Sequence, residues 1–192
     1  RAVLEAVPMG LRVPLVYNTG GYETVETLKL LEGIIDIYLP DIRYADNEIA
    51  RKYSHVKGYV EANRAAIEEM YRQVGNLKLD NDGVAKKGLI MRHLILPEGL
   101  AGSEASLAWL AEEISPEAHL SIMAQYYPAH RAPRYPALTR RINIDEYNRV
   151  MGLLERLGME NGWFQELDAP DSYQPDFTRE GNPFTRENLK PP

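Results

Sequence analysis

Residues 89–96 read Leu-Ile-Met-Arg-His-Leu-Ile-Leu, which is the strongest strand signal in the chain, and Pro97 ends it. A run that is mostly apolar on both faces is typical of a buried strand in a parallel sheet. Similar runs lie at residues 13–18, 34–39 and 119–125. Helical patterns at 24–31, 46–53, 58–74, 103–114 and 145–157 alternate with them. The alternation predicts an α/β fold with a parallel sheet of about four strands.

Two architectures are compatible with this order, an open doubly wound sheet and part of a β/α barrel. No Gly-x-Gly-x-x-Gly motif or P-loop follows any of the strands, so a nucleotide-binding fold lacks its usual phosphate cradle. We therefore favour the barrel, which places function at the carboxyl ends of the strands. Residues 77–86 predict a small hairpin with an Asp-Gly turn.

The composition excludes several kinds of chemistry. The 192 residues include 22 Lys and Arg against 28 Asp and Glu, and the net charge of −6 argues against nucleic acid as a partner. No apolar run approaches the roughly 20 residues that span a bilayer, so we expect a cytoplasmic protein with no membrane partner. The chain has no cysteine, which excludes thiolate nucleophiles and any iron–sulfur ligation by cysteines of these residues.

Charge and proline content divide the chain in two. Residues 159–192 carry a net charge of −4, which leaves −2 on residues 1–158. Five prolines and the lack of any periodic apolar pattern predict that 159–192 is an irregular acidic extension. We expect its aromatic residues, Trp163 and Phe164 among them, to lie over the body formed by 1–158.

Polar residues end three of the four apolar runs. An acid at the mouth of a core needs a cation or several hydrogen-bond donors, so Asp41 is the sharpest candidate among them. Side chains alternate across a sheet, so one of Arg92 and His93 points toward the helices and the other toward the opposite face. Arg92 then binds either a ligand carboxylate or Asp41, and a purely structural ion pair is an equally open interpretation. The candidates at the strand ends are Asn18, Thr19, Asp41, Arg43, Gln125 and Tyr126.

The segment from 118 to 144 contains no acid but holds Arg131, Arg134, Arg140 and Arg141. Such a basic, proline-stiffened loop suits an anionic partner surface or a lid over a charged ligand, and a plain solvated loop is the alternative. The four histidines show no metal-like spacing, and no nucleophile elbow or catalytic triad order is present.

Four segments in this order resemble the later strands of the radical S-adenosylmethionine (SAM) superfamily, in its pyruvate formate-lyase-activating-enzyme-like branch. They are residues 14–23, 36–44, 91–97 and 123–126, and the resemblance covers about residues 1–165. It implies a partial (β/α)6 barrel in which a Cys-x3-Cys-x2-Cys loop holds a [4Fe–4S] cluster. The cluster cleaves SAM reductively to a 5′-deoxyadenosyl radical that abstracts hydrogen.

The resemblance also implies a SAM-side site. Asn18 and Thr19 match the end of the family's third strand, Asp41 and Arg43 its fourth, and Arg92 an arginine on the fifth that faces SAM. Gln125 and Tyr126 match the end of the sixth. The implied partners are SAM, an electron donor and a protein substrate such as a glycyl radical enzyme. Arg43 stands where the activating enzymes often have Lys, which argues for a different substrate.

The chain departs from the family in having no cysteine and no counterpart of the first two strands. We therefore expect it to be the C-terminal part of such an enzyme, without activity by itself and with a bare sheet edge at residues 13–18. Two alternatives remain. One is a non-radical β/α-barrel enzyme with Asp41 as base and Arg92 as carboxylate clamp. The other is a protein-docking module that uses the basic loop at 131–141.

Overall fold

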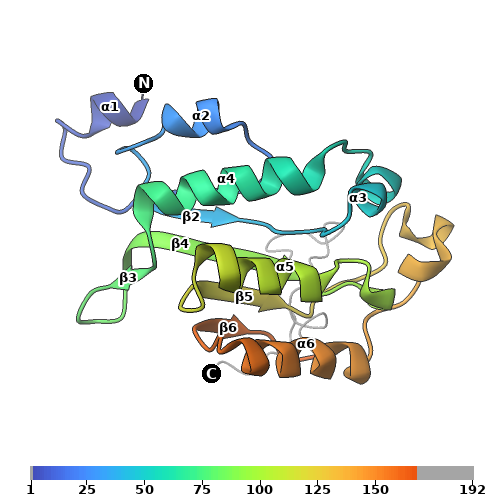
Figure 1. The fold of residues 1–192 in the computed structure, drawn as a ribbon. Helices are drawn as coiled ribbons and strands as arrows, with labels where there is room; N and C mark the ends of the chain where they lie inside the picture. The colour runs from blue at the N-terminus through green and yellow to red at the C-terminus, as the bar shows by residue number, and fades with distance from the viewer. Residues whose placement is uncertain (1, 168–192) are drawn as a thin grey trace, which may run out of the picture.

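The computed structural model describes residues 2–167, which build one mostly parallel sheet with helices along one face (Figure 1). The strands are β1 (Val16–Thr19), β2 (Ile37–Pro40), β3 (Lys78–Leu79), β4 (Ala85–Leu94), β5 (His119–Met123) and β6 (Gly162–Phe164). The α-helices are α1 (Ala2–Ala6), α2 (Val25–Lys29), α3 (Asn47–Ser54), α4 (Tyr59–Val74), α5 (Ser103–Trp109) and α6 (Ile144–Leu157). The other helical segments described are η1 (Pro97–Gly99), η2 (Leu110–Ile114), η3 (Ala132–Arg134) and η4 (Pro136–Leu138).

The strand order is β1-β2-β4-β5-β6, with all four neighbouring pairs parallel, and β3 pairs antiparallel with β4. This order follows the chain without a reversal. A doubly wound sheet changes direction at the point where it binds its ligand, and the described sheet has no such point. The α/β class and the parallel sheet are confirmed.

Helices α2, α4, α5 and α6 lie over the same face of the sheet (Figure 1). The main core forms between them and that face, where Tyr38, Met91 and Leu120 are fully buried. The opposite face carries a smaller apolar cluster of Ile37, Leu77 and Ile90. One face is thus sealed by helices, and the other presents the remaining side chains of each strand.

Local sequence signals explain where the helices begin and end. Asp46 caps α3 by accepting hydrogen bonds from the backbone of Glu48 and Ile49 at 2.7 and 2.9 Å. Asn143 and Glu146 form a reciprocal capping box at the start of α6, and Gly158 ends that helix in a left-handed conformation. The predicted helices at 46–53, 58–74 and 145–157 are confirmed to within one residue at either end.

The sheet has one more parallel strand than the sequence predicted. Residues 162–164 fall within the predicted irregular extension, but they form β6 and pair with β5. A β-carbon on Gly162 would lie 2.0 Å from the carbonyl oxygen of Leu120, so only glycine lets the two backbones approach this closely. The Gly-Trp-Phe segment is too short to show an alternating pattern, which explains the error. The rest of the predicted extension, 168–192, lies outside the described residues.

At the opposite end of the sheet, β1 pairs only with β2 among the described strands, and Val16 is 54% exposed. The strand begins three residues later than predicted. No helix in residues 2–167 has the length and apolar character needed to cross a bilayer.

Candidate functional site

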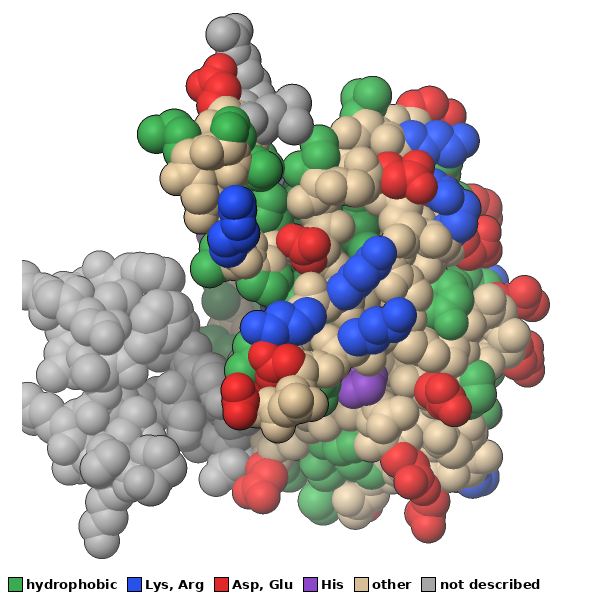
Figure 2. All heavy atoms as spheres, turned by 90° about the vertical axis from the view of Figure 1, so that its left-hand side faces the viewer, with side chains coloured by type: hydrophobic (Ala, Val, Ile, Leu, Met, Phe, Trp, Pro, Cys, Tyr) green, Lys and Arg blue, Asp and Glu red, His purple; other side chains and the backbone are tan. Residues whose placement is uncertain are grey.

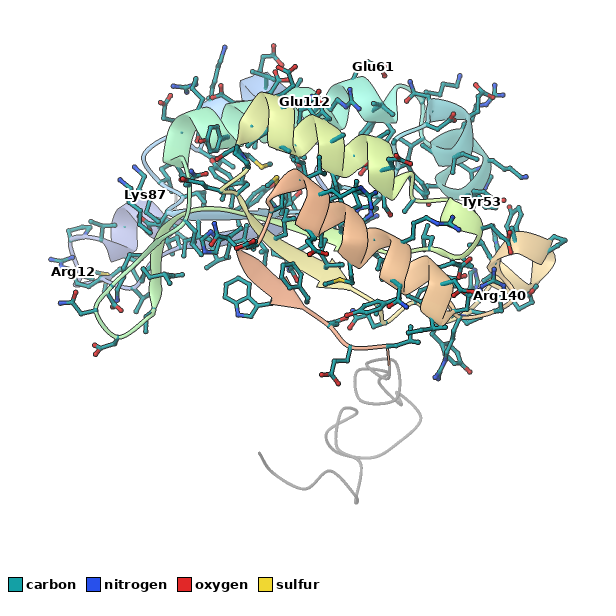
Figure 3. The ribbon with its side chains drawn as sticks, turned by 60° about the horizontal axis from the view of Figure 1, so that its bottom comes forward. Arg12, Tyr53, Glu61, Lys87, Glu112 and Arg140 are labelled. Carbon is teal, nitrogen blue, oxygen red and sulfur yellow. The ribbon has the colours of Figure 1, made fainter. Side chains whose placement is uncertain are left out.

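The carboxyl ends of β2, β4 and β5 surround a pocket of about 330 Å³. In Figure 3 these strand ends point to the side of the molecule that bears Tyr53 and Arg140. Five of the seven predicted site residues line the pocket, and an Asn18 side-chain bond to Arg92 joins a sixth to them. The lining residues are Asp41, Ile42, Arg43, Tyr44, Ser54, Arg92, Leu94, Leu96, Met123, Gln125 and Tyr126.

Asp41 is the centre of the charged cluster. Arg43 donates from Nη2 and Nε to Asp41 Oδ2 at 2.7 and 3.1 Å. Arg92 Nε lies 3.2 Å from the other carboxylate oxygen, Oδ1, and Arg92 Nη1 donates to Asn18 Oδ1 at 3.1 Å. Within these three side chains, two arginines around one carboxylate leave one positive charge in excess.

The Oδ1 atom of Asp41 is buried, and it accepts no hydrogen bond despite its ion-pair distance to Arg92. A buried acceptor without a donor is costly, and the charge of Arg92 at 3.2 Å offsets part of that cost. Burial lowers the pKa of Arg43, but the hydrogen bond and charge of Asp41 outweigh it and raise the pKa overall. Arg43 therefore stays cationic.

Arg92 and His93 point to opposite faces, as the alternation predicts. His93 is fully buried on the helix side, where Nδ1 bonds to the carbonyl of Ile42 and Nε2 to Ser103 Oγ, both at 2.8 Å. A carbonyl only accepts, so Nδ1 carries the proton and Nε2 accepts from Ser103. Burial lowers the pKa of His93 although the bond to Ile42 opposes this, which keeps the ring neutral.

Thr19 is the one predicted site residue whose side chain bonds within a turn and not at the pocket. Its hydroxyl donates to the carboxylate of Glu23 and accepts from the backbone of Gly21 at 3.3 Å. Its carbonyl accepts from the backbone of Asp41 at 3.0 Å. Thr19 therefore shapes the turn after β1, and its side chain is not part of the pocket wall.

Gln125 and Tyr126 form the β5 side of the pocket. Gln125 accepts a hydrogen bond from Gln165 at 3.1 Å, and the Tyr126 hydroxyl donates to the carbonyl of Leu138 at 2.9 Å. Burial raises the pKa of Tyr126. Both side chains are thus fixed by segments that come later in the chain.

The pocket contains residues that the sequence did not single out. Tyr44 and Ser54 share a hydrogen bond of 2.9 Å between their hydroxyl groups. Met123 lies within 3.8 Å of Arg92 Nη2. Tyr44 could have been found because it follows Asp41 and Arg43 directly, but Ser54 is at the end of α3 and carries no such signal.

The basic loop is partly engaged inside the molecule. Arg140 (labelled in Figure 3) bonds to Glu146 from Nη1 at 2.8 Å and to Glu98 from Nη2 at 2.5 Å. The Arg140 hydrogen bond lowers the pKa of Glu146 to about 2, against burial. Arg141 lies over the ring of Tyr127, 5.2 Å from its centre. Arg140 thus fastens the loop to α6 and to η1.

No cluster of three or more His, Cys, Asp or Glu side chains within residues 2–167 is arranged to hold a metal ion. The sequence contains no cysteine at all. The donor set for a cysteine-ligated cluster is therefore missing from this chain.

The chain is similar to the uncharacterized protein MJ0674 of Methanocaldococcus jannaschii, with 28% identity over 149 residues. That alignment covers 77% of this chain but only 40% of the archaeal protein, so the chain spans less than half the length of the relative. No family model matches the sequence. No solved structure matches it either.

Proposed function

We propose that this chain is the C-terminal part of a radical SAM enzyme and supplies the SAM-facing side of its site. One observation carries the proposal. Asn18 and Arg92 lie in β1 and β4, and Asp41 and Gln125 directly follow β2 and β5. All four lie along one edge of the sheet, at or next to the pocket. They are residues that the resemblance names for SAM.

The fold supports the proposal. Parallel strands that follow the chain order, with their helices on one face, are the arrangement of a β/α barrel wall. Barrel enzymes place their sites at the carboxyl ends of the strands, where this pocket lies. We take the described sheet to be a segment of such a wall, with its open face toward the barrel interior.

The residues present fit one of the two implied cofactors. A [4Fe–4S] cluster of this family needs three thiolates, and this chain has none, so it does not hold the cluster. SAM carries a carboxylate and an ammonium group. Arg92 and Arg43 offer guanidinium groups to the former, and the carboxylate of Asp41, which lines the pocket, offers a negative charge to the latter.

When SAM is bound with a reduced cluster, the cofactor pair supplies the radical chemistry. The residues of this chain would bind and orient SAM and exclude water around it. Leu94, Leu96 and Met123 provide the apolar part of that wall.

The first test of the proposal is the gene sequence upstream of this chain. The reading frame upstream of this chain should encode a Cys-x3-Cys-x2-Cys motif within roughly the preceding hundred residues. Calorimetry with SAM on this chain by itself should give weak or undetectable binding. A sub-micromolar affinity would contradict the division of the site between two parts of the protein.

Arg92→Ala in the full-length protein is the sharper test. It should weaken SAM binding by roughly tenfold or more, because a charge-assisted hydrogen bond in a half-buried site contributes about 1.5–3 kcal/mol. Arg149→Ala, which changes an exposed arginine of α6, is the matched control and should leave the affinity unchanged. Equal affinities for both variants would make Arg92 a structural residue.

If the upstream frame lacks the cysteine motif, the same pocket fits the non-radical alternative, in which Asp41 and Arg92 act on a carboxylate substrate. The docking alternative has less support, since Arg140 is held by Glu98 and Glu146 and Arg141 lies over Tyr127.

A further inference from the structure

The segment Asp41–Arg43 is held through its backbone by side chains from other elements. Asn63 Nδ2 donates to the carbonyl of Asp41 at 2.9 Å, and His93 Nδ1 bonds to the carbonyl of Ile42 at 2.8 Å. The backbone N–H of Arg43 donates to the hydroxyl of Tyr59 at 2.9 Å. Segments that follow a strand are usually mobile loops, whereas this one is bonded at each of its three residues.

The sheet itself bonds the remaining amides. The N–H of Asp41 donates to the carbonyl of Thr19 at 3.0 Å, and that of Ile42 to the carbonyl of Arg92 at 2.8 Å. Both bonds continue the pairing with β1 and β4 past the last residue of β2, Pro40. The segment is therefore fixed on one side by β1 and β4 and on the other by the three side chains.

All three side chains are buried. Tyr59 is 4% exposed, Asn63 1% and His93 fully buried. Tyr59 and Asn63 lie one turn apart on the face of α4 that packs on the sheet. A polar group at such a position costs stability unless it is hydrogen-bonded, and these groups are bonded to the backbone of the segment that bears the pocket charges.

Asn63 also joins two loops. Its Nδ2 donates to the carbonyl of Gly21, after β1, at 2.7 Å, as well as to Asp41. A β-carbon on Gly21 would lie 2.3 Å from Asn63 Nδ2 and 2.4 Å from the carbonyl oxygen of Asp41. The turn after β1 and the segment after β2 are thus stacked on each other with one amide bonded to both.

We propose that Tyr59, Asn63 and His93 form a clamp of positioning residues that sets the directions of Asp41 and Arg43 before any ligand binds. None of the three lines the pocket, so each acts through the backbone of the segment it holds. Preorganised groups cost less to order when a ligand arrives. The clamp itself stands on the structure alone, and its effect on SAM rests on the proposed function.

Tyr59→Phe tests the clamp by removing one of its hydrogen bonds. It removes the hydroxyl that accepts from Arg43 but retains the ring that stacks on Tyr22 and meets Tyr44 edge-on. Tyr38→Phe is the matched control. Tyr38 is also buried, its pKa is also raised to about 12 with burial as the main cause, and its hydroxyl donates to Gln73, which is not part of the pocket lining.

Amide hydrogen exchange by NMR on the 192-residue chain provides the first readout. Relative to the amide of Leu120 in the core, the amides of Ile42 and Arg43 should exchange roughly three- to tenfold faster in Tyr59→Phe than in the wild type. Tyr38→Phe should leave that ratio unchanged. An unchanged ratio in Tyr59→Phe, or an equal change in both variants, overturns the clamp.

The side chain of Arg43 provides the second readout. Its Nε–H, bonded to Asp41, should exchange faster in Tyr59→Phe and not in Tyr38→Phe. Exchange at the Arg43 amide without any change at Nε would show that the backbone bond does not set the direction of the side chain, which overturns the positioning role.

SAM affinity of the full-length protein separates this proposal from the previous one. Tyr59→Phe should raise the dissociation constant about three- to tenfold, with no change in Tyr38→Phe. If SAM does not bind even to the wild type, the proposed function fails, while the two exchange measurements still decide the clamp. If SAM binds both variants equally well, the positioning role is wrong.

Discussion

The two ends of the sheet use their polar side chains differently. At the carboxyl end, Arg92 bonds to both Asn18 and Asp41, although Asn18 is 74 residues away in the chain. At the amino end the polar bonds are single contacts. Asp36 accepts from the backbone of Leu15 at 2.8 Å, and Asp80 pairs with Lys86 at 2.9 Å within one hairpin. Figure 3 shows this end as the side that bears Arg12 and Lys87.

The amino end also leaves like charges together. Lys78 and Lys87 are direct partners in the β3–β4 register, and both are exposed. Figure 2, which looks onto this end, shows several Lys and Arg side chains gathered near its middle. Exposed charges in water interact weakly, so the fold tolerates this arrangement. The comparison shows that a charged cluster joining residues at three strand ends lies at the pocket, whereas the charges named at the amino end bond singly or remain exposed.

Two glycines test this contrast with the largest expected effect. Gly21 and Gly33 have nearly equal φ values of +72° and +75°, but a β-carbon on Gly33 would meet nothing within 4 Å. Gly33→Ala should cost about 1–2 kcal/mol of unfolding free energy, for the backbone conformation alone. Gly21→Ala should cost about 3–5 kcal/mol, because it also displaces Asn63 and Asp41. Urea denaturation measures both, and equal losses would mean that the stacked loops are free to separate.

Two carboxylates give a smaller contrast. Asp41→Asn leaves Arg43 and Arg92 without a counter-charge at a largely buried position and should cost about 1–3 kcal/mol. Asp80→Asn changes the net charge equally but should cost clearly less than Asp41→Asn, since Lys86 is exposed and an amide oxygen still accepts from the turn. Thermal or urea unfolding of both variants would refute the contrast if the Asp80 variant proved the less stable.

The smallest effect concerns the pH dependence of stability. Burial lowers the pKa of His93 below the value of about 6.5 expected in the unfolded chain. The unfolded state then binds the proton more readily, so stability is present at neutral pH and is lost as the pH falls through about 6.5. His93 should contribute a slope of at most about 1.4 kcal/mol per pH unit between pH 7 and 5.

His93→Asn should remove that part of the slope, while the asparagine amide can still donate to Ile42. His55→Asn is the control, because His55 is exposed and its left-handed conformation suits asparagine. Urea unfolding at several pH values measures the slopes. Parallel slopes for the wild type and His93→Asn would contradict the prediction, because they would show that folding does not lower the pKa of His93.

The sequence predicted those features that depend on strand periodicity. Alternation along residues 89–96 separated Arg92 from His93, and the polar ends of the apolar runs identified Asp41 as the partner of Arg92. Parallel strands bring their carboxyl ends to one edge, which is why residues so far apart could be expected together.

Other features depend on single contacts that periodicity does not encode. Thr19 bonds to Glu23 because of how one turn closes, and Asn63 reaches the loops from a helix 22 and 42 residues later. The sequence does mark Asn63 in one way, because it is a polar residue on the apolar face of α4. In β6, pairing depends on one glycine beside Leu120, and no pattern of hydrophobic residues reveals it.

The position of β1 has a consequence for the handling of the protein. One edge of β1, residues 16–19, pairs with no other described strand, and Val16 is largely exposed there. Unpaired strands of this kind add a further strand readily, from any chain that offers one. Two molecules that paired through β1 about a twofold axis would form one continuous sheet. The oligomeric state would then depend on the protein concentration.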